Sequence, residues 1–207
     1  MVTKGALKNI LQICTYAETG DGSQVAIASV TNQIQKLFEQ FSTGGFRTLG
    51  VAYKTTDADK PITKDSETDM TFIGLLTFWD PPKEGILETI KTLNSMGVAL
   101  KVITGDNTLV AKNIGQQIGL KDAQLMSGPE LSAMSDEALM KQVGAVHIFT
   151  EVEPNQKERI ILALKKIGKV VGYMGDGIND ASAIRAAHGG RSIEWGLTSL
   201  LPARWPV

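Results

Sequence analysis

The sequence has a single cysteine, no long hydrophobic run and almost no excess of charge of either sign. Cys14 has no second cysteine to pair with, which excludes an intrachain disulfide framework and favours a buried thiol in a reducing compartment. The longest mainly apolar run, Met70 to Trp79, is about half as long as a membrane-spanning helix requires. The amino terminus also lacks the charged-then-apolar pattern of a signal peptide, so we expect a soluble, cytoplasmic chain.

The charge balance argues against two classes of partner. The 21 Lys and Arg residues and 22 Asp and Glu residues leave a formal net charge of −1, which sets up no field for nucleic acid or for an anionic membrane surface. With 207 residues, of which 43% are hydrophobic, the chain is long enough for one sizeable core or for a domain and part of a second. We therefore expect an ordinary globular protein that does not bind nucleic acid.

The first third of the chain predicts two helices, a strand and a loop. Apolar residues recur every three or four positions from Val25 to Phe41, which places them on one face of a helix. A shorter helix is expected over Ala6 to Cys14, and a strand over Thr48 to Tyr53. The stretch from Thr55 to Asp69 is polar and contains a proline, so it predicts a loop and a domain boundary. We expect domains over residues 1–68 and 69–187, followed by an atypical tail over 188–207.

Beyond that boundary, apolar strands alternate with amphipathic helices. This alternation predicts an α/β fold with a Rossmann-like parallel sheet that is covered by helices on both faces. In such sheets ligands bind at the carboxyl ends of the strands. The expected strands are Phe72 to Phe78, Ala99 to Ile103, His147 to Thr150 and Lys169 to Met174; the expected helices are Glu84 to Met96, Leu109 to Ile118, Asp136 to Val143, Asn155 to Lys166 and Ala181 to Ala187.

One expected strand runs directly into the turn Thr104-Gly105-Asp106, which opens a helix. The Thr104 hydroxyl and the free backbone N–H groups of such a turn can hold phosphate oxygens, and Gly105 allows them a close approach. The alternative is an ordinary turn in which Asp106 caps the helix. The same tripeptide also occurs at Thr19-Gly20-Asp21, in an expected surface loop, so the motif alone does not decide between them.

A second turn, from Gly175 to Asp180, is more specific because it follows a strand and concentrates polar groups. Asp176 and Asp180 offer the hard oxygen ligands that Mg²⁺ prefers, and Asn179 would orient them or bond a phosphate oxygen. Gly175 and Gly177 leave room for metal and phosphate. The alternative is a glycine-rich turn with solvated carboxylates.

Lys157 lies in the first turn of an expected helix that begins at Pro154. A lysine is unfavourable at this end of a helix unless an anion binds there, so Lys157 would neutralise a transferring phosphoryl group. The alternative is a solvated surface lysine. Since no Walker-type loop is present, the chain is not a P-loop NTPase.

These motifs, in this order, resemble the phosphorylation domain of P-type cation-transporting ATPases, within the haloacid dehalogenase superfamily, and most of all the bacterial magnesium-transporting branch. Further segments resemble the family's hinge and part of its α+β nucleotide-binding domain. The matching segments are Lys4-Gly5-Ala6, Gly45-Phe46-Arg47-Thr48-Leu49, Asp80-Pro81-Pro82-Lys83, Thr104-Gly105-Asp106, Glu153-Pro154-Asn155-Gln156-Lys157 and Met174-Gly175-Asp176-Gly177-Ile178-Asn179-Asp180.

The resemblance implies ATP and Mg²⁺ as cofactors and assigns roles to the matching residues. Lys4 with Gly5 would lie near the adenine of ATP, and Arg47 at its phosphates. Thr104, Gly105 and Asp106 would face the nucleotide and the phosphoryl group, whose charge Lys157 would stabilise. Asp176 and Asp180 would hold Mg²⁺, and Asn179 would complete the catalytic site.

Two departures from the family pattern stand out. The nucleophilic aspartate of an Asp-Lys-Thr-Gly-Thr signature is absent; the nearest lookalike, Asp57-Ala58-Asp59, lacks the preceding strand and the following threonine. We therefore expect no aspartyl-phosphate on this chain by itself. After Ala187, where the family continues into another apolar strand, the chain reads His188-Gly189-Gly190-Arg191 and then an aperiodic tail. We interpret this tail as a frameshift or an artificial terminus that denies the sheet its next strand.

The resemblance implies a segment from the cytoplasmic face of a pump, whose transmembrane and actuator domains lie outside this chain. ATP would phosphorylate the pump's aspartate, and hydrolysis of the acyl phosphate would drive cation transport. Two other function classes stay open. A soluble phosphatase of the same superfamily would need its own nucleophile near the amino terminus, and a non-catalytic nucleotide-binding fragment would need none.

Overall fold

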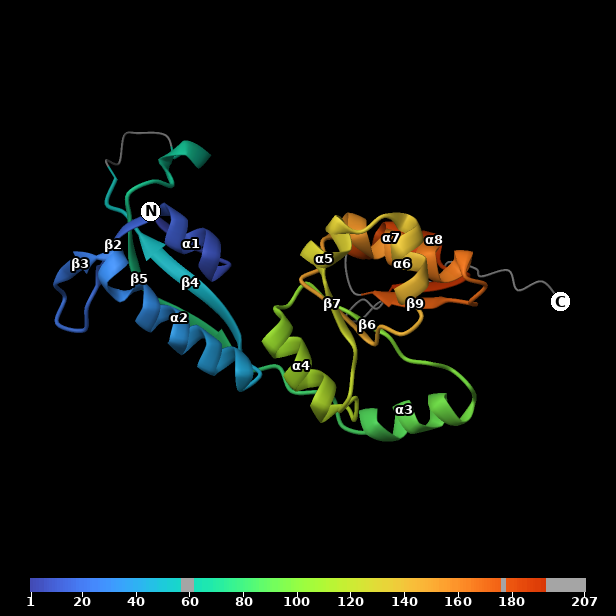
Figure 1. Ribbon diagram of the computed structural model, residues 1–207. Helices are drawn as coiled ribbons and strands as arrows, with labels where there is room; N and C mark the ends of the chain where they lie inside the picture. The colour runs from blue at the N-terminus through green and yellow to red at the C-terminus, as the bar shows by residue number, and fades with distance from the viewer. Residues whose placement is uncertain (57–61, 176–177, 193–207) are drawn as a thin grey trace. The chain divides into compact units, whose positions relative to one another are not determined.

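The computed structural model in Figure 1 describes residues 1–56, 62–175 and 178–192, which form two compact units. The first unit is Met1–Pro82 and the second is Lys83–Val207. The division therefore differs from the boundary expected at 68/69, and it coincides with the Asp80-Pro81-Pro82-Lys83 segment that resembles a hinge. The lookalike Asp57-Ala58-Asp59 and the predicted site residues Asp176 and Gly177 lie outside the described residues.

The first unit is a mixed five-stranded sheet with two helices. The strand order is β1-β4-β5-β2-β3, in which β2 and β5 are parallel and the other neighbours are antiparallel. The elements are β1 Val2–Gly5, α1 Leu7–Ile13, β2 Cys14–Glu18, β3 Gln24–Ala26, α2 Ile27–Thr43, β4 Arg47–Tyr53, the 3-10 turn Lys64–Ser66 and β5 Met70–Phe78.

Helices α1 and α2 bury one face of this sheet. Buried Ile10 of α1 and Ile34 of α2 pack with Ala52 of β4 and with Met70 and Phe72 of β5 in a single apolar cluster. Strand β4 alternates strictly, since Thr48, Gly50 and Ala52 are buried and the residues between them are not. This alternation is the signature of a strand with one covered face, and it leaves the opposite face of the sheet accessible.

Strand β5 belongs to the first sheet, not to the parallel sheet in which it was expected. It pairs with β4 from Arg47↔Phe78 to Tyr53↔Thr71, antiparallel, and runs parallel to β2 on its other side. The predicted start of the strand, Phe72, is two residues after the observed start, Met70, and its end at Phe78 was predicted correctly. Its partners were predicted wrongly because a continuous apolar run shows that a strand is buried without showing which strands lie beside it.

The second unit alternates strands and helices, and all strand pairs among its described residues are parallel. A three-stranded sheet has the order β6-β8-β7, and a separate pair joins β9 to β10. The elements are α3 Ile86–Ser95, β6 Val102–Ile103, α4 Thr108–Gln117, β7 Leu125–Ser127, α5 Gly128–Ala133, α6 Asp136–Gln142, β8 Ile148–Thr150, α7 Pro154–Lys166, β9 Gly172–Gly175, the 3-10 turn Ile178–Asp180, α8 Ala181–Ala186 and β10 Gly189–Ser192.

Helices cover both faces of the three-stranded sheet. On β8, Phe149 packs in the cluster built from α5, α6 and α7, whereas its neighbour Ile148 approaches Gly115 of α4 so closely that a Cβ there would lie 2.5 Å from Ile148 Cδ1. Successive strand residues face opposite ways, so α4 lies on one side and α5 to α7 on the other. The prediction of a mixed α/β fold is confirmed.

The chain continues as a strand after Ala187, contrary to the expectation that the sheet gains no further strand there. Residues Gly189 to Ser192 form β10 and pair in parallel with β9. A Cβ on Gly190 would lie 2.2 Å from the carbonyl oxygen of Ile184 in α8. Gly190, one of the two glycines that were expected to end the strand pattern, instead lets the strand lie directly against that helix.

Within the described ranges, no helix is both long enough and apolar enough to cross a membrane.

Candidate functional site

The predicted turn at Thr104 lies beside the carboxyl end of β8 and is held there by backbone hydrogen bonds. The Val152 N–H donates to the Thr104 carbonyl at 3.0 Å, and the Glu151 N–H donates to the Asp106 carbonyl at 2.9 Å. Helix α7 begins two residues after Val152, at Pro154. The turn after β6 and the start of α7 are therefore neighbours at the same edge of the parallel sheet.

Inside this turn, the two polar side chains bond to each other. The Thr104 hydroxyl donates to Asp106 Oδ2 at 2.9 Å and accepts from the Asp106 backbone N–H at 3.1 Å. The N-cap of α4 is Asn107, whose side-chain oxygen accepts from two backbone N–H groups of the first turn. The alternative in which Asp106 caps the helix is therefore wrong. Exposed Gly105 lies at the tip of the turn.

The first turn of α7 is fixed by a buried amide. Gln156 accepts from the Glu153 backbone N–H at 2.8 Å, and its Nε2 donates to the Gly128 carbonyl at 2.9 Å and to the Ser132 hydroxyl at 2.7 Å. Its side chain thus ties the start of α7 to α5 while satisfying its own polar atoms. Lys157, the next residue, is held in place by this anchorage.

Lys157 is not a solvated surface lysine. Its Nζ donates to Asp180 Oδ1 at 2.7 Å, and the side chains are only 15% and 4% exposed. The ion pair joins the start of α7 to the turn that follows β9, so it brings together two motifs that lie 23 residues apart. Asn179, in the same turn, is exposed. The alternative of solvated carboxylates is wrong for Asp180.

Two residues of β9 position Asp180: Tyr173, to which the motif analysis assigned no role, and Gly175, which was expected to leave room for metal and phosphate and instead leaves room for Asp180. The Tyr173 hydroxyl donates to Asp180 Oδ1 at 2.8 Å. A Cβ on Gly175 would lie 2.5 Å from Asp180 Cβ, so only glycine leaves space for this carboxylate. Tyr173 and Gly175 are the buried positions of an alternating strand, and this period-two pattern was the available signal.

Glu151 is a second feature that the sequence did not reveal. Its φ of 55° is in the left-handed region, where a non-glycine residue costs about 1–3 kcal/mol. Its carboxylate accepts from the Thr108 hydroxyl at 3.3 Å, next to the Thr104 turn. Its carbonyl points at Gly128, where a Cβ would lie 2.2 Å from the Glu151 oxygen. The strained residue lies at the edge where the predicted phosphate turn and α7 meet.

Of the two predicted metal ligands, Asp180 is the described one. Carboxylate oxygens suit Mg²⁺, so Asp180 fits the expected chemistry. Among the described residues, no group of three or more His, Cys, Asp or Glu side chains is placed to hold a metal ion.

The predicted nucleotide contacts Lys4 and Arg47 share one face of the first sheet. Lys4 of β1 is paired with Val51 of β4, and Arg47 is four residues from Val51 along that strand. Paired residues share a face and so do residues separated by an even number, which places both cations on the face away from α1 and α2. At about 3.3 Å per residue, some 13 Å of strand separates the two positions. Gly5, also predicted to contact the nucleotide, is paired with Gly50.

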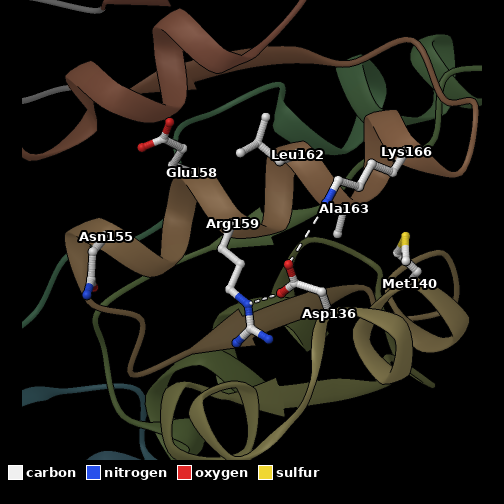
Figure 2. A pocket seen from close by; sticks show the side chains of 8 residues that line it. All are labelled: Asp136, Met140, Asn155, Glu158, Arg159, Leu162, Ala163 and Lys166. Atoms are coloured by element: carbon white, nitrogen blue, oxygen red, sulfur yellow. Dashed lines mark hydrogen bonds and ion pairs between the residues drawn. The ribbon is translucent and has the colours of Figure 1, made fainter.

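A pocket between α6 and α7 is lined by Asn155 of the motif at residues 153–157 but by none of the predicted site residues (Figure 2). Its Arg159 donates from Nε to Asp136 Oδ1 at 2.9 Å and from its two terminal nitrogens to the carbonyls of Leu131 and Met134, each at 2.6 Å. The hydrogen bonds of the Arg159 guanidinium join α5 and α6 to α7. Lys166 Nζ lies 3.9 Å from Asp136 Oδ2. The pocket is therefore a structural junction.

Comparison with known proteins extends the motif-level similarity to nearly the whole chain. Residues 1–85 match the family model for the P-type ATPase cytoplasmic domain N. Over 201 residues, covering 94% of this chain, the sequence is 36% identical to "Magnesium-transporting ATPase, P-type 1" of Salmonella typhimurium, and it is 35% identical to the protein of the same name in Escherichia coli strain K12. A calcium-transporting ATPase of Listeria monocytogenes is 33% identical over 90% of the chain. The chain spans 22% of the length of each of these relatives.

Proposed function

Because this chain is related to the P-type cation-transporting ATPases over nearly its whole length, we propose that it is the ATP-handling segment of such a pump, exposed at the cytoplasmic face of the membrane. Its first unit would bind the nucleotide. Its second unit would provide most of a haloacid dehalogenase-like phosphoryl-transfer site. The chain spans 22% of the length of the relatives it matches. We therefore propose, as part of the same function, that the parent protein hydrolyses ATP and transports a cation.

The observation that carries the proposal is the buried pairing of Lys157 with Asp180. A cation and a carboxylate that are this little exposed persist only with good geometry and further hydrogen bonds. The pair lies where the carboxyl ends of β8 and β9, strands of two separate parallel sheets, lead into α7 and α8. Ligands bind at such strand ends in α/β proteins. Lys157 would stabilise phosphoryl charge there, and Asp180 with Asp176 would hold Mg²⁺.

The edges of the two sheets in the second unit support the proposal that another part of the parent pump supplies the nucleophile segment. Among the described strands, β6 pairs only with β8 and β9 pairs only with β10, so each sheet ends in an edge strand. The Lys157–Asp180 pair nevertheless connects elements that belong to the two sheets. A strand from elsewhere in the parent pump would enter between β6 and β9 and present its aspartate beside Thr104, Gly105 and Asp106.

The remaining roles follow from this arrangement. Lys4, Gly5 and Arg47 would contact ATP on the accessible face of the first sheet. The Thr104 hydroxyl and the backbone N–H groups of the turn would hold phosphate oxygens, and Asn179 would orient the phosphoryl group. Mg²⁺, when bound, neutralises phosphate charge. Selectivity for the transported cation belongs to membrane segments that are not part of this sequence.

A specific observation favours a non-catalytic nucleotide-binding role for the chain by itself. The nucleophilic signature is absent from the sequence, so Mg²⁺ and radiolabelled ATP should give no acid-stable, hydroxylamine-labile phosphoprotein. Detecting such an acyl phosphate on the purified chain would contradict this part of the proposal. A soluble phosphatase is less well supported, because residues 1–85 match the family model for the P-type ATPase cytoplasmic domain N.

Nucleotide binding is tested by calorimetric titration with Mg²⁺ and a non-hydrolysable ATP analogue. Replacing either Lys4 or Arg47 with Ala should weaken the affinity about tenfold, which corresponds to the loss of a charge-assisted contact to ATP. Lys8→Ala is the matched control, since Lys8 is an exposed cation on α1 and lies outside the motifs. Equal affinities for all four proteins would exclude the proposed nucleotide face.

A further inference from the structure

The carboxylate of Asp180 is held by more groups than the motif residues provide. Its Oδ1 atom accepts from Lys157 Nζ at 2.7 Å and from the Tyr173 hydroxyl at 2.8 Å. Asp180 is 3% exposed and Tyr173 is 9% exposed, so this phenol–carboxylate bond is shielded from water. Burying a charge requires several hydrogen bonds with good geometry, and a single ion pair seldom provides enough.

Strand β9 is built to receive this carboxylate. Tyr173 and Gly175 are its two buried positions, and they lie on one face because they are two residues apart. Gly175 leaves space in which Asp180 approaches the strand backbone, while Tyr173 supplies a donor on the same face. The ring has few rotatable bonds and is packed in the apolar cluster of the second unit, so the hydroxyl is held in one place.

We propose that Tyr173 is a positioning residue of the phosphoryl-transfer site, and that its hydroxyl fixes Asp180 Oδ1 in the orientation that also receives Lys157. This inference rests on the proposed function, because a fixed orientation of the Asp180 carboxylate matters for activity only if the phosphoryl-transfer site is present. Tyr173 acts through Asp180 and touches neither substrate nor metal. Without the hydroxyl, Asp180 would rotate, and both its pairing with Lys157 and its contribution to Mg²⁺ binding would weaken.

The decisive experiment measures how strongly Lys157 and Asp180 are coupled, with and without the hydroxyl. A double-mutant cycle of Lys157→Met and Asp180→Asn gives the coupling as a ratio of unfolding equilibrium constants. We expect about tenfold coupling with Tyr173 present and about threefold or less in the Tyr173→Phe background. A merely structural tyrosine would destabilise all four proteins of the cycle alike, and unchanged coupling would overturn the proposal.

A measurement on the unaltered chain covers the case in which a variant fails to fold. The chain has three tyrosines, so ¹³Cζ labelling gives three resonances. In an equal mixture of H₂O and D₂O, a buried hydroxyl with slow exchange should split the Tyr173 line in two. Tyr16, which is 46% exposed, should give one averaged line. A single averaged line for Tyr173 would also overturn the proposal.

Titration with MgCl₂ alone separates this inference from the proposed function. Binding should raise the stability of the folded chain, and Tyr173→Phe should weaken the affinity for Mg²⁺ about threefold or more. The matched control is Tyr53→Phe, which removes a phenol–carboxylate bond of 2.7 Å to Glu18 in the first unit and should leave the affinity unchanged. A wild-type chain that does not respond to Mg²⁺ would contradict the proposed metal site, while the coupling measurement would still decide the role of Tyr173.

Discussion

Two glycines of strand β9, only three positions apart, have very different surroundings. A Cβ on Gly175 would lie 2.5–2.7 Å from atoms of Asp180, whereas a Cβ on Gly172 would lie 3.7 Å from its nearest neighbour, the Gly189 carbonyl. At Gly175 the added methyl group has no space, because the facing carboxylate is held by Lys157 and Tyr173. The strand sequence alone does not distinguish the two glycines.

Gly175→Ala should therefore destabilise the second unit by about 2 kcal/mol, the usual range for an overpacked buried site. It should also weaken Mg²⁺ binding by displacing Asp180. Gly172→Ala, as the matched control, should change the free energy of unfolding by less than about 0.5 kcal/mol. Urea denaturation of both variants measures the difference. Equal effects of the two substitutions would show that Asp180 does not occupy the space beside Gly175.

The buried thiol of Cys14 should make the stability of the folded chain depend on pH. Burial raises its thiol pKa from 9.0 to about 11, so the folded state retains the proton after the unfolded state has lost it. This contribution to stability is fully present below pH 9 and is lost as the pH rises towards 11. The free energy of unfolding should fall more steeply over that interval for the wild type than for Cys14→Ala. Parallel curves for the two proteins would contradict the raised pKa.

For individual residues, the sequence predicted the site best where polar residues follow apolar strands. Thr104, Lys157 and Asp180 were predicted as site residues, and the structure places the Thr104 turn beside the start of α7 and pairs Lys157 with Asp180. Tyr173 and Gln156 were not predicted as contacts, because each acts through a partner that is distant in sequence or hidden in a neighbouring turn. Their types and periodicity also suit ordinary core positions.

Among the secondary-structure elements, strand β10 is the one whose presence can be tested most specifically. It lies against α8 because Gly190 has no side chain, since a Cβ there would lie 2.2 Å from the Ile184 carbonyl. Gly189 precedes it in the same strand, and a Cβ on Gly189 would meet nothing within 4 Å. The two glycines therefore form a natural pair for testing whether the strand is present.

Gly190→Ala should displace β10 and expose the edge of β9, while Gly189→Ala should leave both strands in place. The obstacle at Gly190 is backbone, which cannot rotate away as a side chain could. Amide hydrogen exchange at Tyr173 and Gly175, whose N–H groups face β10, should become at least tenfold faster in the first variant only. Unchanged exchange in both variants would mean that β10 is not paired with β9 in solution.

The longer helices were predicted well from the sequence, and so was the short strand β8, whereas other short strands were missed. Helix α7 was predicted within one residue because its apolar residues repeat over thirteen positions after a proline. Strands β3 and β7 have three residues each, too few for a period-two pattern to stand out. The pairing of β5 depends on contacts across the sheet, which local sequence does not contain.

At the scale of the whole molecule, each of the two units carries its own group of predicted site residues. The first unit, Met1–Pro82, carries Lys4 and Arg47 on its accessible sheet face, and the family match over residues 1–85 covers this unit. The second unit carries the Lys157–Asp180 pair and two sheets with open edges. The mixed α/β class and the resemblance to P-type ATPases were accessible from the sequence, whereas the boundary at Pro82 emerged only from the pairing of β5.

The central claim is that this chain retains the nucleotide site of a pump. Backbone NMR of the purified chain, titrated with Mg²⁺ and a non-hydrolysable ATP analogue, tests the claim most directly. We expect saturable shifts that cluster at Lys4, Gly5 and Arg47 and extend to Thr104 and Asp180. A folded spectrum without shifts at these residues would contradict the claim.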